Sequence, residues 1–375
     1  MTGAAARLDR LVVRDFRNLA HVELEPPAAG LVVVGENGQG KTNLLEAIHY
    51  LAILRSARGA RDVDLVRFGA AGFHVGAAVE TNGRHEIGVG FERSGKRKRA
   101  RIDGSVPERL SDALGALPSV LFSPDDVELI GGSPNARRRY LDIMLALTTP
   151  GYLAALQRYR AALVRRNAAL REAARSTRAG SASVAVWEPA LAAQGAVLWS
   201  ARVAWVESMA GRFRALAAEI GEAERAELRY TSALSADGPP ADALAAALEE
   251  KRPLDLRRGL THAGPHRDDL AITLDGRELR TFGSAGQQRS AAIALRMLEA
   301  ATFRERSGRA PLFLLDDPFA ELDVRRAARI LAMLTRDAPG QTILAVPRDS
   351  DIPTELTRLA RVRVAAGTIE RFRVE

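Results

Sequence analysis

The feature that most constrains this chain is a glycine-rich segment at residues 35–42, which directly follows a short apolar run. The segment matches the pattern G-x-x-x-x-G-K-T, and residues 43–54 then carry leucine and isoleucine at helical spacing. A buried strand, a glycine loop and a helix N-terminus together present backbone N–H groups to a phosphate. The sequence therefore predicts an α/β domain that binds a nucleotide.

ATP and Mg²⁺ are the expected cofactors of this loop. Lys41 is expected to reach the β- and γ-phosphates, and the Thr42 hydroxyl to ligate Mg²⁺. A glycine-rich turn at a helix start is the alternative, but the context and the scarcity of lysine favour phosphate binding. The predicted nucleotide-binding residues are Gly35, Glu36, Asn37, Gly38, Gln39, Gly40, Lys41 and Thr42.

A second apolar run, residues 312–315, ends in two carboxylates. Asp316 is predicted to hold Mg²⁺, directly or through water. Asp317 is predicted to orient or activate the attacking water, which makes Lys41 and Asp317 the candidate catalytic residues. Solvated acids at a strand end are the alternative, and the glycine loop favours the catalytic interpretation.

A third motif, residues 284–289, reads S-A-G-Q-Q-R and precedes a helical pattern at residues 290–304. A serine hydroxyl and a glycine backbone at a helix N-terminus can bind a phosphate. Taken alone, this motif is as well explained by a helix cap. Its position one helix before the carboxylate-ended strand makes it more specific.

The rest of the chain divides by its periodicity. Residues 73–102 predict an antiparallel meander, and residues 137–230 are helical and rich in Ala, Leu and Arg. Strand patterns resume at residues 270–274 and 342–346. We therefore expect a mixed-sheet α/β head with a short inserted helical arm, divided into residues 1–140, 141–255 and 256–375.

Charge and composition narrow the class of partner. The net charge is +8 and the sequence pI is about 10.3, which favours a polyanion such as nucleic acid. Only four of the 54 basic residues are lysine, an arginine excess that GC-rich codon usage also explains, so charge alone leaves DNA binding open. Without cysteine there is no disulfide framework, and without a long apolar run or an apolar leader we expect a cytoplasmic protein with no membrane segment.

Basic side chains crowd one predicted hairpin and the start of the helical region. Such groups suit contacts to a DNA backbone, although a solvated charged face is the alternative. Aromatic residues do not interleave with these clusters, so duplex binding is expected more than base stacking. The predicted DNA contacts are Arg93, Lys96, Arg97, Lys98, Arg99, Arg137, Arg138 and Arg139.

The order of these motifs resembles that of an ABC-type ATPase head. The glycine loop comes first, followed by the S-x-G-Q motif, the carboxylate-ended strand and residues 320–323. More narrowly, the sequence resembles the RecF family of bacterial recombination mediators. Four stretches carry that resemblance: residues 16–18; residues 35–46; residues 122–126 with 132–134 and 137–142; and residues 264–270.

The resemblance implies that ATP joins two heads into a homodimer that clamps DNA. Ser284, Gly286 and Gln287 would contact the γ-phosphate held by Lys41 of the partner subunit. Asp323 would lie at the dimer seam, and Arg17 and Asn18 would approach the phosphates or ribose. The implied role is to bind double-stranded DNA beside single-strand gaps and, with RecR and RecO, to help load RecA in DNA repair, replication restart and the SOS response.

Several positions depart from the common ABC pattern. Asp317 stands where many heads have glutamate, and residues 346–348 contain no switch histidine. The signature begins with Phe282 and has Ala285 in place of glycine, and no Q-loop glutamine can be placed, although residues 122–126 lie where it should be. These departures imply a weak ATPase whose slow hydrolysis serves as a switch.

Other ATPase machines remain as alternatives. An SMC-like or break-repair head, working with a nuclease or structural partner, would have a far longer arm. A transporter ATPase would show a fuller signature and a switch histidine, and a phage-type ATPase–nuclease fusion would need a further domain. Residues 266–269, H-R-D-D, suggest an internal ion-pair network more than a metal site, because no second histidine stands at ligand spacing.

Overall fold

The structure, a computed structural model, describes residues 5–174, 180–221, 225–234, 238–319, 322–337, 340–357 and 359–371. The chain forms two compact units. Unit 1 contains Met1–Asp126 and Ile293–Glu375, and unit 2 contains Val127–Ala292. The chain therefore leaves unit 1 once and returns to it once.

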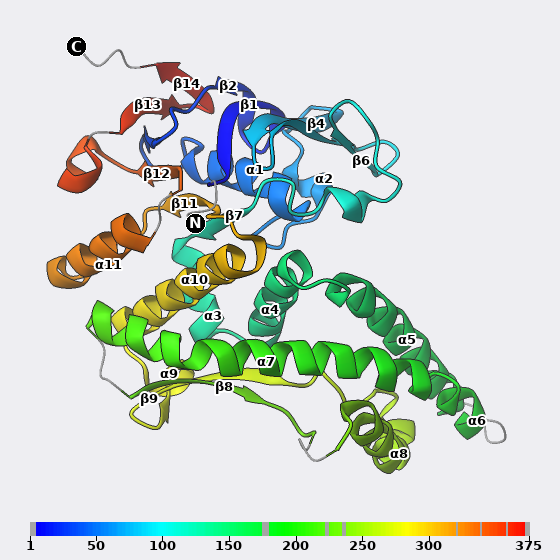
Figure 1. Ribbon diagram of the computed structural model, residues 1–375. Coiled ribbons are helices and arrows are strands. Elements are labelled where there is room, and N and C mark those ends of the chain that lie inside the picture. The colour runs from blue at the N-terminus through cyan, green and yellow to red at the C-terminus, as the bar shows by residue number, and fades with distance from the viewer. Residues whose placement is uncertain are drawn as a thin grey trace. The chain divides into compact units, whose positions relative to one another are not determined.

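Unit 1 contains a five-stranded antiparallel sheet and a six-stranded, mostly parallel sheet (Figure 1). The first has the order β2-β1-β4-β5-β6 and the second the order β14-β13-β3-β12-β11-β7. The strands of the first are β1 (Arg7–Phe16), β2 (Leu19–Leu24), β4 (Gly72–Glu80), β5 (Arg84–Glu92) and β6 (Arg97–Ile102). Those of the second are β3 (Gly30–Val34), β7 (Ser119–Phe122), β11 (Leu312–Asp316), β12 (Thr342–Val346), β13 (Ala360–Ala365) and β14 (Thr368–Arg371).

The helix α1 (Lys41–Ile53) lies in the core that both sheets share. Leu44 and Ile48 of α1 are buried with Val75 of the antiparallel sheet and Leu31 of the parallel sheet. The strand β3 is buried along its whole length, as expected of a central parallel strand. This packing fixes the start of α1 at the carboxyl edge of β3, where a phosphate-binding loop must lie.

Helices and short turns complete unit 1. Leu331 and Leu334 of α11 (Val324–Asp337) share a small cavity with Phe313 of β11, so α11 covers a face of the parallel sheet. The short elements are α2 (Asp62–Leu65), η1 (Leu110–Ala113), η2 (Pro124–Val127), η3 (Asp349–Asp351) and η4 (Thr354–Leu356). The helix α10 (Ala285–Ser307) begins in unit 2 and ends in unit 1.

A partly buried ion pair joins the two places where the chain crosses between the units. Asp126 is the last residue of unit 1 before the inserted unit, and Arg296 lies in α10 just after the chain returns. Within unit 1, Arg296 donates to Asp126 at 2.6 Å and to Glu299 at 2.7 Å. The ends of the inserted segment are therefore held side by side.

Unit 2 is mainly helical with one small antiparallel sheet of order β10-β9-β8. Its strands are β8 (Ala226–Thr231), β9 (Asp269–Leu274) and β10 (Arg277–Glu278). Its helices are α3 (Glu128–Gly131), α4 (Pro134–Thr148), α5 (Tyr152–Ala173), α6 (Gly180–Ala185), α7 (Glu188–Ile220), α8 (Pro240–Arg258) and α9 (Leu279–Phe282), with the start of α10. Tyr140 of α4 packs edge-on against Trp205 of α7, which anchors the long helix.

The predicted strands at residues 31–34, 312–315 and 342–346 and the meander at residues 73–102 are confirmed. The helical pattern expected to continue to residue 230 is wrong at its end. Gly221 ends α7 with φ 112°, and β8 follows it because Ala226 and Leu228 alternate into the core as β8 pairs with β9. The expected boundaries at residues 141 and 255 also differ from the division at residues 126 and 292, because α4 and the small sheet belong to unit 2.

Candidate nucleotide-binding site

The glycine loop lies in unit 1 between the end of β3 and the start of α1, as the sequence predicted. Gly38 and Gly40 have φ values of 80° and 120°, in the left-handed region that side chains disfavour. A Cβ atom at Gly35 would lie 2.4 Å from the carbonyl oxygen of Val364. Gly38 and Gly40 are therefore needed for their backbone conformation, and Gly35 is needed for close packing against Val364.

Lys41 folds back over the loop that precedes it. Its Nζ donates to the carbonyl oxygens of Gly35 at 2.6 Å and of Glu36 at 3.0 Å, and the side chain is buried. Burial lowers the pKa of Lys41, and the carboxylates of Asp316 and Asp317 oppose that shift. The ammonium group is thus held in the hollow of the loop, close to the predicted metal ligand Asp316 and the predicted catalytic residue Asp317.

Asp316 is the last residue of β11, the strand two places from β3 in the parallel sheet, and Asp317 follows it directly. Burial raises the pKa of Asp316, which accepts a hydrogen bond from Thr42 that acts in the opposite direction. Hydroxyl and carboxylate oxygens are the ligands that Mg²⁺ prefers, so Thr42 and Asp316 fit the predicted metal role. Asp317 has φ 45°, an uncommon conformation for a residue with a side chain and one that occurs often at functional sites.

Five of the eight predicted loop residues, together with Asp316 and Asp317, line one cavity of about 450 Å³. This volume suits a small-molecule ligand. The cavity is lined by Asn37, Gly38, Gly40, Lys41, Thr42, Asn43, Arg58, Pro124, Asp316, Asp317 and Pro347. Pro124 belongs to the segment expected at the Q-loop position, and Pro347 to the segment that lacks the switch histidine.

Arg17 and Asn18 support the loop, and neither is among the residues that line the cavity. Asn18 donates its amide to the carbonyl oxygen of Gly38 at 3.3 Å and accepts from Asn43 at 2.8 Å. Arg17 pairs at 3.1 Å with Glu46, a buried carboxylate of α1. Asn18 thus braces the loop and Arg17 braces α1, while the approach of these two side chains to phosphates or ribose stays a prediction.

Arg58 is a cavity residue that no sequence motif predicted. It donates to Asn43 at 2.8 Å and to Glu46 at 2.9 Å, so its guanidinium is fixed at the edge of the cavity. Arginine is abundant in this chain, and Arg58 lies outside every motif. Only the fold, which carries residues 54–60 back past α1, brings it to the site.

The S-x-G-Q motif belongs to unit 2 and caps α10. The Ser284 hydroxyl accepts from the backbone of Gln287 at 3.3 Å, and the Gln287 side chain accepts from the backbone of Ser284 at 3.0 Å. Ser284 is exposed, and so is Phe282, with 69% of its surface accessible. The motif is therefore a helix cap within one chain and still accessible to a ligand.

Asp323 caps α11 in a similar way. Its carboxylate accepts from the backbone N–H groups of Arg325 and Arg326 at 3.0 Å each. The hydrogen bond from the Arg326 backbone is the main cause that lowers the pKa of Asp323. Residues 320 and 321 of the same motif lie outside the described residues.

The predicted DNA contacts on the β5–β6 hairpin divide into two groups. The side chains of Arg93, Lys96, Arg97 and Arg99 are exposed. Lys98 instead donates to the carbonyl oxygen of Leu54 at 2.7 Å and pairs with Asp62 at 2.6 Å. Because Lys98 is committed to these contacts, it is removed from the set.

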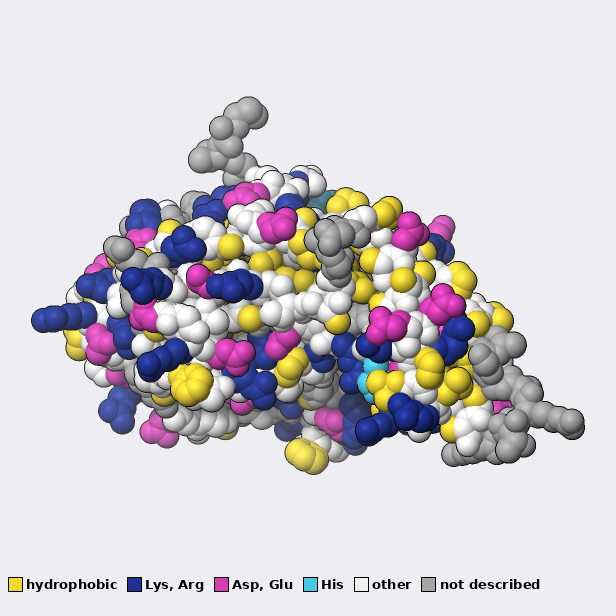
Figure 2. Space-filling view, turned by 90° about the horizontal axis from the view of Figure 1, so that it is seen from below, with side chains coloured by type: hydrophobic (Ala, Val, Ile, Leu, Met, Phe, Trp, Pro, Cys, Tyr) yellow, Lys and Arg dark blue, Asp and Glu magenta, His cyan; other side chains and the backbone are white. Residues whose placement is uncertain are grey.

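The second predicted cluster is structural. Arg137 is only 4% exposed and donates two hydrogen bonds of 2.8 Å to Asp269, so its assignment as a DNA contact is corrected. Arg138 donates to the carbonyl oxygen of Asp268 at 2.7 Å, and Arg139 is partly buried and also has partners in the protein. On the face shown in Figure 2, basic side chains are interspersed with acidic ones and form no single uninterrupted patch.

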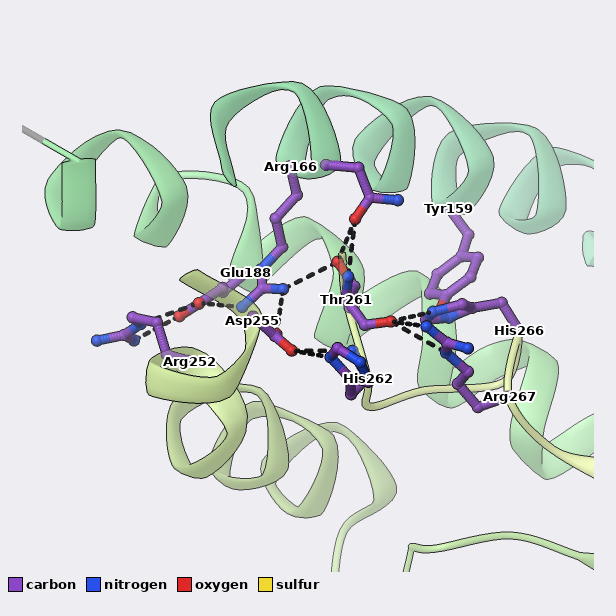
Figure 3. A network of polar contacts seen from close by, with 10 residues as sticks. Tyr159, Arg166, Glu188, Arg252, Asp255, Thr261, His262, His266 and Arg267 are labelled. Carbon is purple, nitrogen blue, oxygen red and sulfur yellow. Dashed lines mark hydrogen bonds and ion pairs between the residues drawn. The ribbon is translucent and has the colours of Figure 1, made fainter. Parts of the chain in front are cut away.

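A buried polar network joins α5, α7 and α8 in unit 2 (Figure 3). Arg166 is fully buried and donates to Asp255 at 2.7 Å and to Glu188 at 2.8 Å. Nearby, Tyr159 donates to Nδ1 of His266 at 2.6 Å, and Nε2 of His266 faces the carbonyl oxygen of Thr261 at 3.0 Å. Such contacts hold helices together.

The segment H-R-D-D thus lies in an internal network, as the sequence suggested. Asp268 accepts from Tyr230 at 2.7 Å and from Ser232 at 2.9 Å, and Asp269 pairs with Arg137. In the described part of the chain, no three His, Asp or Glu side chains gather as metal ligands would. Nor does that part contain a helix that is long and apolar enough to cross a membrane.

These features together define an ABC-type ATPase head. They are a phosphate-binding loop beside a carboxylate-ended strand, an antiparallel side sheet, and an inserted unit that carries an S-x-G-Q helix cap. Residues 7–369 match the RecF/RecN/SMC N terminal domain. The chain belongs to this family and, within it, to RecF. Membership of this ATPase family implies binding and hydrolysis of ATP.

Similar proteins place the chain close to RecF along nearly its whole length. It is 38% identical to the DNA replication and repair protein RecF of Frankia alni, over 97% of this chain and 99% of that protein. It is 41% identical to the RecF of Anaeromyxobacter dehalogenans strain 2CP-C, over 90% of this chain and 91% of that protein.

Solved structures agree with this assignment. The structure described as the recombination mediator protein RecF with ATP in the RecFOR pathway has a TM-score of 0.89 at 28% identity and covers 99% of each chain. An SMC head bound to the C-winged helix domain of ScpA has a TM-score of 0.55 at 16% identity, over 97% of this chain and 96% of that one, which shows a shared fold.

Proposed function

We propose that this protein is an ATP-dependent, DNA-binding recombination mediator that acts in DNA repair, replication restart and the SOS response. The observation that carries the proposal is the division of the ATP-site parts. Lys41, Thr42, Asp316 and Asp317 share one cavity in unit 1, whereas Ser284 and its motif cap a helix in unit 2. Likeness to RecF over nearly the whole chain supports the same role.

In the proposed site, the glycine loop binds the phosphates through its backbone N–H groups and Lys41. ATP would draw the Lys41 ammonium from the carbonyl oxygens of Gly35 and Glu36 to the β- and γ-phosphates. Thr42 and Asp316 would hold Mg²⁺, which neutralises charge on the phosphates. Asp317 would orient the attacking water. Its side chain is shorter than glutamate, and the weak hydrolysis proposed here follows from that shorter reach.

A second copy of the chain would complete the site. Ser284, Gly286 and Gln287 would contact the γ-phosphate bound by Lys41 of the partner subunit, with Asp323 at the seam. Ser284 is exposed, and its hydroxyl already accepts one hydrogen bond at the positively polarised end of α10. ATP would then hold the homodimer together, and hydrolysis would release it.

DNA would bind through its backbone to the exposed cations of the β5–β6 hairpin. Arg93, Lys96, Arg97 and Arg99 remain in the proposed contact set. The expected DNA is a duplex beside a single-strand gap, where the clamp, with RecR and RecO, helps to load RecA. This work on the bacterial chromosome would take place in the cytoplasm.

The size of the protein in solution tests the proposal. We expect the wild type to change from monomer to dimer when ATP, Mg²⁺ and duplex DNA are added, and Lys41→Met to stay monomeric. Light scattering coupled to size exclusion measures both. The exposed Lys251→Met is the control, because it removes the same charge outside the site. A wild type that stays monomeric with ATP and DNA would contradict the proposed ATP-dependent homodimer that clamps DNA.

A further inference from the structure

The turn of the C-terminal hairpin contacts the phosphate-binding loop directly. This turn, residues 365–368, connects β13 to β14. The backbone N–H of Ala366 donates to the Gln39 side chain at 2.6 Å, and that of Gly367 donates to the Gln39 carbonyl oxygen at 2.9 Å. One loop residue is therefore held at both its side chain and its backbone, by a segment more than 300 residues later in the chain.

The turn fits this position closely. Gly367 is buried with φ 77°, and a Cβ atom there would lie 2.2 Å from the carbonyl oxygen of Asn18. Asn18 in turn donates to the Gly38 carbonyl oxygen at 3.3 Å. The loop, the β1–β2 turn and the hairpin turn are thus packed together, with space for glycine at residue 367 and for no larger residue.

We infer that residues 365–368, which lie outside the cavity lining, act as a clamp that positions the phosphate-binding loop before ATP arrives. This inference rests on the proposed binding of ATP. Gln39 is the positioning residue through which the clamp acts. With Gln39 held, the apex of the loop keeps one conformation while Lys41 rests on the Gly35 carbonyl oxygen. ATP then binds to an ordered loop, which favours tight binding and slow release.

The clamp also explains why the loop has glutamine at this position. A side-chain amide is long enough to reach the neighbouring turn, and its oxygen accepts from Ala366. Ala366 has φ 47° and Gly367 has φ 77°, the two positive values that a two-residue type I′ hairpin turn requires, and the N–H groups of both residues donate to Gln39.

The test compares Gln39→Ala and Gly367→Ala with the wild type by titration with a fluorescent ATP analogue and by its dissociation rate. Gln39→Ala removes one hydrogen bond, and Gly367→Ala forces the turn away from Asn18. Each is expected to raise the Kd for the nucleotide about 3- to 10-fold, mainly through faster release. The double variant is expected to bind little worse than Gly367→Ala, because both changes break the same contact.

Controls separate this clamp from general damage and from failure of the proposed function. Gly83→Ala is the matched control, since Gly83 also has a positive φ, at 121°, in a turn where a Cβ meets nothing within 4 Å. Thermal unfolding without nucleotide shows whether each variant is folded. If Gly367→Ala does not fold, the comparison of Gln39→Ala with the wild type still tests the inference. A wild type that fails to bind ATP sinks the proposed function. If the wild type binds ATP but Gln39→Ala has an unchanged Kd, only the positioning role of residues 365–368 is contradicted. Additive effects in the double variant would contradict it as well.

Discussion

Asp317 shows how much a single residue depends on its backbone. It follows β11 directly, has φ 45° and donates its backbone N–H to the carbonyl oxygen of Ala345 at 2.9 Å. Strained positions of this kind persist where the surrounding structure determines them. The neighbouring strand thus fixes the direction in which this carboxylate leaves the sheet.

We expect Asp317→Asn to slow ATP hydrolysis by about 100-fold or more while leaving the Kd for ATP within about twofold. The amide keeps the shape of the carboxylate but cannot accept a proton, and Lys41 with its loop contacts is untouched. Single-turnover hydrolysis and equilibrium titration measure the two quantities. The exposed Asp275→Asn is the control, because Asp275 has a similar φ of 50° in unit 2, and hydrolysis at the wild-type rate in Asp317→Asn would remove Asp317 from the catalytic role.

At the scale of elements, the β5–β6 hairpin carries the remaining prediction about DNA. We expect the double substitution Arg97→Glu and Arg99→Glu to weaken duplex binding and to reduce the slope of log K against log salt by about 2, because each arginine neutralises about one phosphate. Fluorescence anisotropy at several salt concentrations measures this slope. The same charge change at the exposed Arg257 and Arg258 of α8 is the control. An unchanged slope would show that the hairpin does not contact the DNA backbone.

The elements that the sequence predicted well are those with strong local patterns. The apolar runs that became β3, β11 and β12 are buried parallel strands, and α1 has both a helical period and a glycine start. The phosphate-binding loop and the carboxylates were found for the same reason, since each motif is continuous in the chain.

The features that the sequence did not predict depend on partners far along the chain. β8 is a strand because it pairs with β9, and the β13–β14 hairpin matters because its turn contacts Gln39. Lys98 and Arg137 were assigned to DNA because a basic cluster looks the same in sequence whether it faces solvent or carboxylates. Burial and pairing are decided by the fold, which only the structure provides.

At the scale of the whole molecule, each unit buries a neutral histidine. Burial lowers the pKa of His49 in unit 1 to about 3 and that of His266 in unit 2 to about 4. In the unfolded chain both would titrate near about 6.5. Between these pKa values the unfolded chain binds protons that the folded protein does not bind. Acid therefore lowers the free energy of unfolding of both units.

We expect the free energy of unfolding to be unaffected by these histidines above about pH 6.5 and to fall as the pH drops from there toward about 4. The contribution of His266 is on the order of 3 kcal/mol. His266→Gln should reduce this pH dependence, because glutamine can accept from Tyr159 and donate to Thr261 without titrating. Denaturant unfolding between pH 7 and 4 measures the difference, with the exposed His21→Gln as the control. Equal slopes for wild type and His266→Gln would contradict the assignment.

The ion pair between Asp126 and Arg296 has a consequence for how such proteins diversify. When the two ends of an inserted segment are held at one point, the cost of closing the insertion rises only slowly with its length. Residues could then be added to or removed from the middle of the arm without moving the strands that carry the phosphate loop and the carboxylates. One ATPase fold can thus carry inserted arms of very different length while its nucleotide site stays the same.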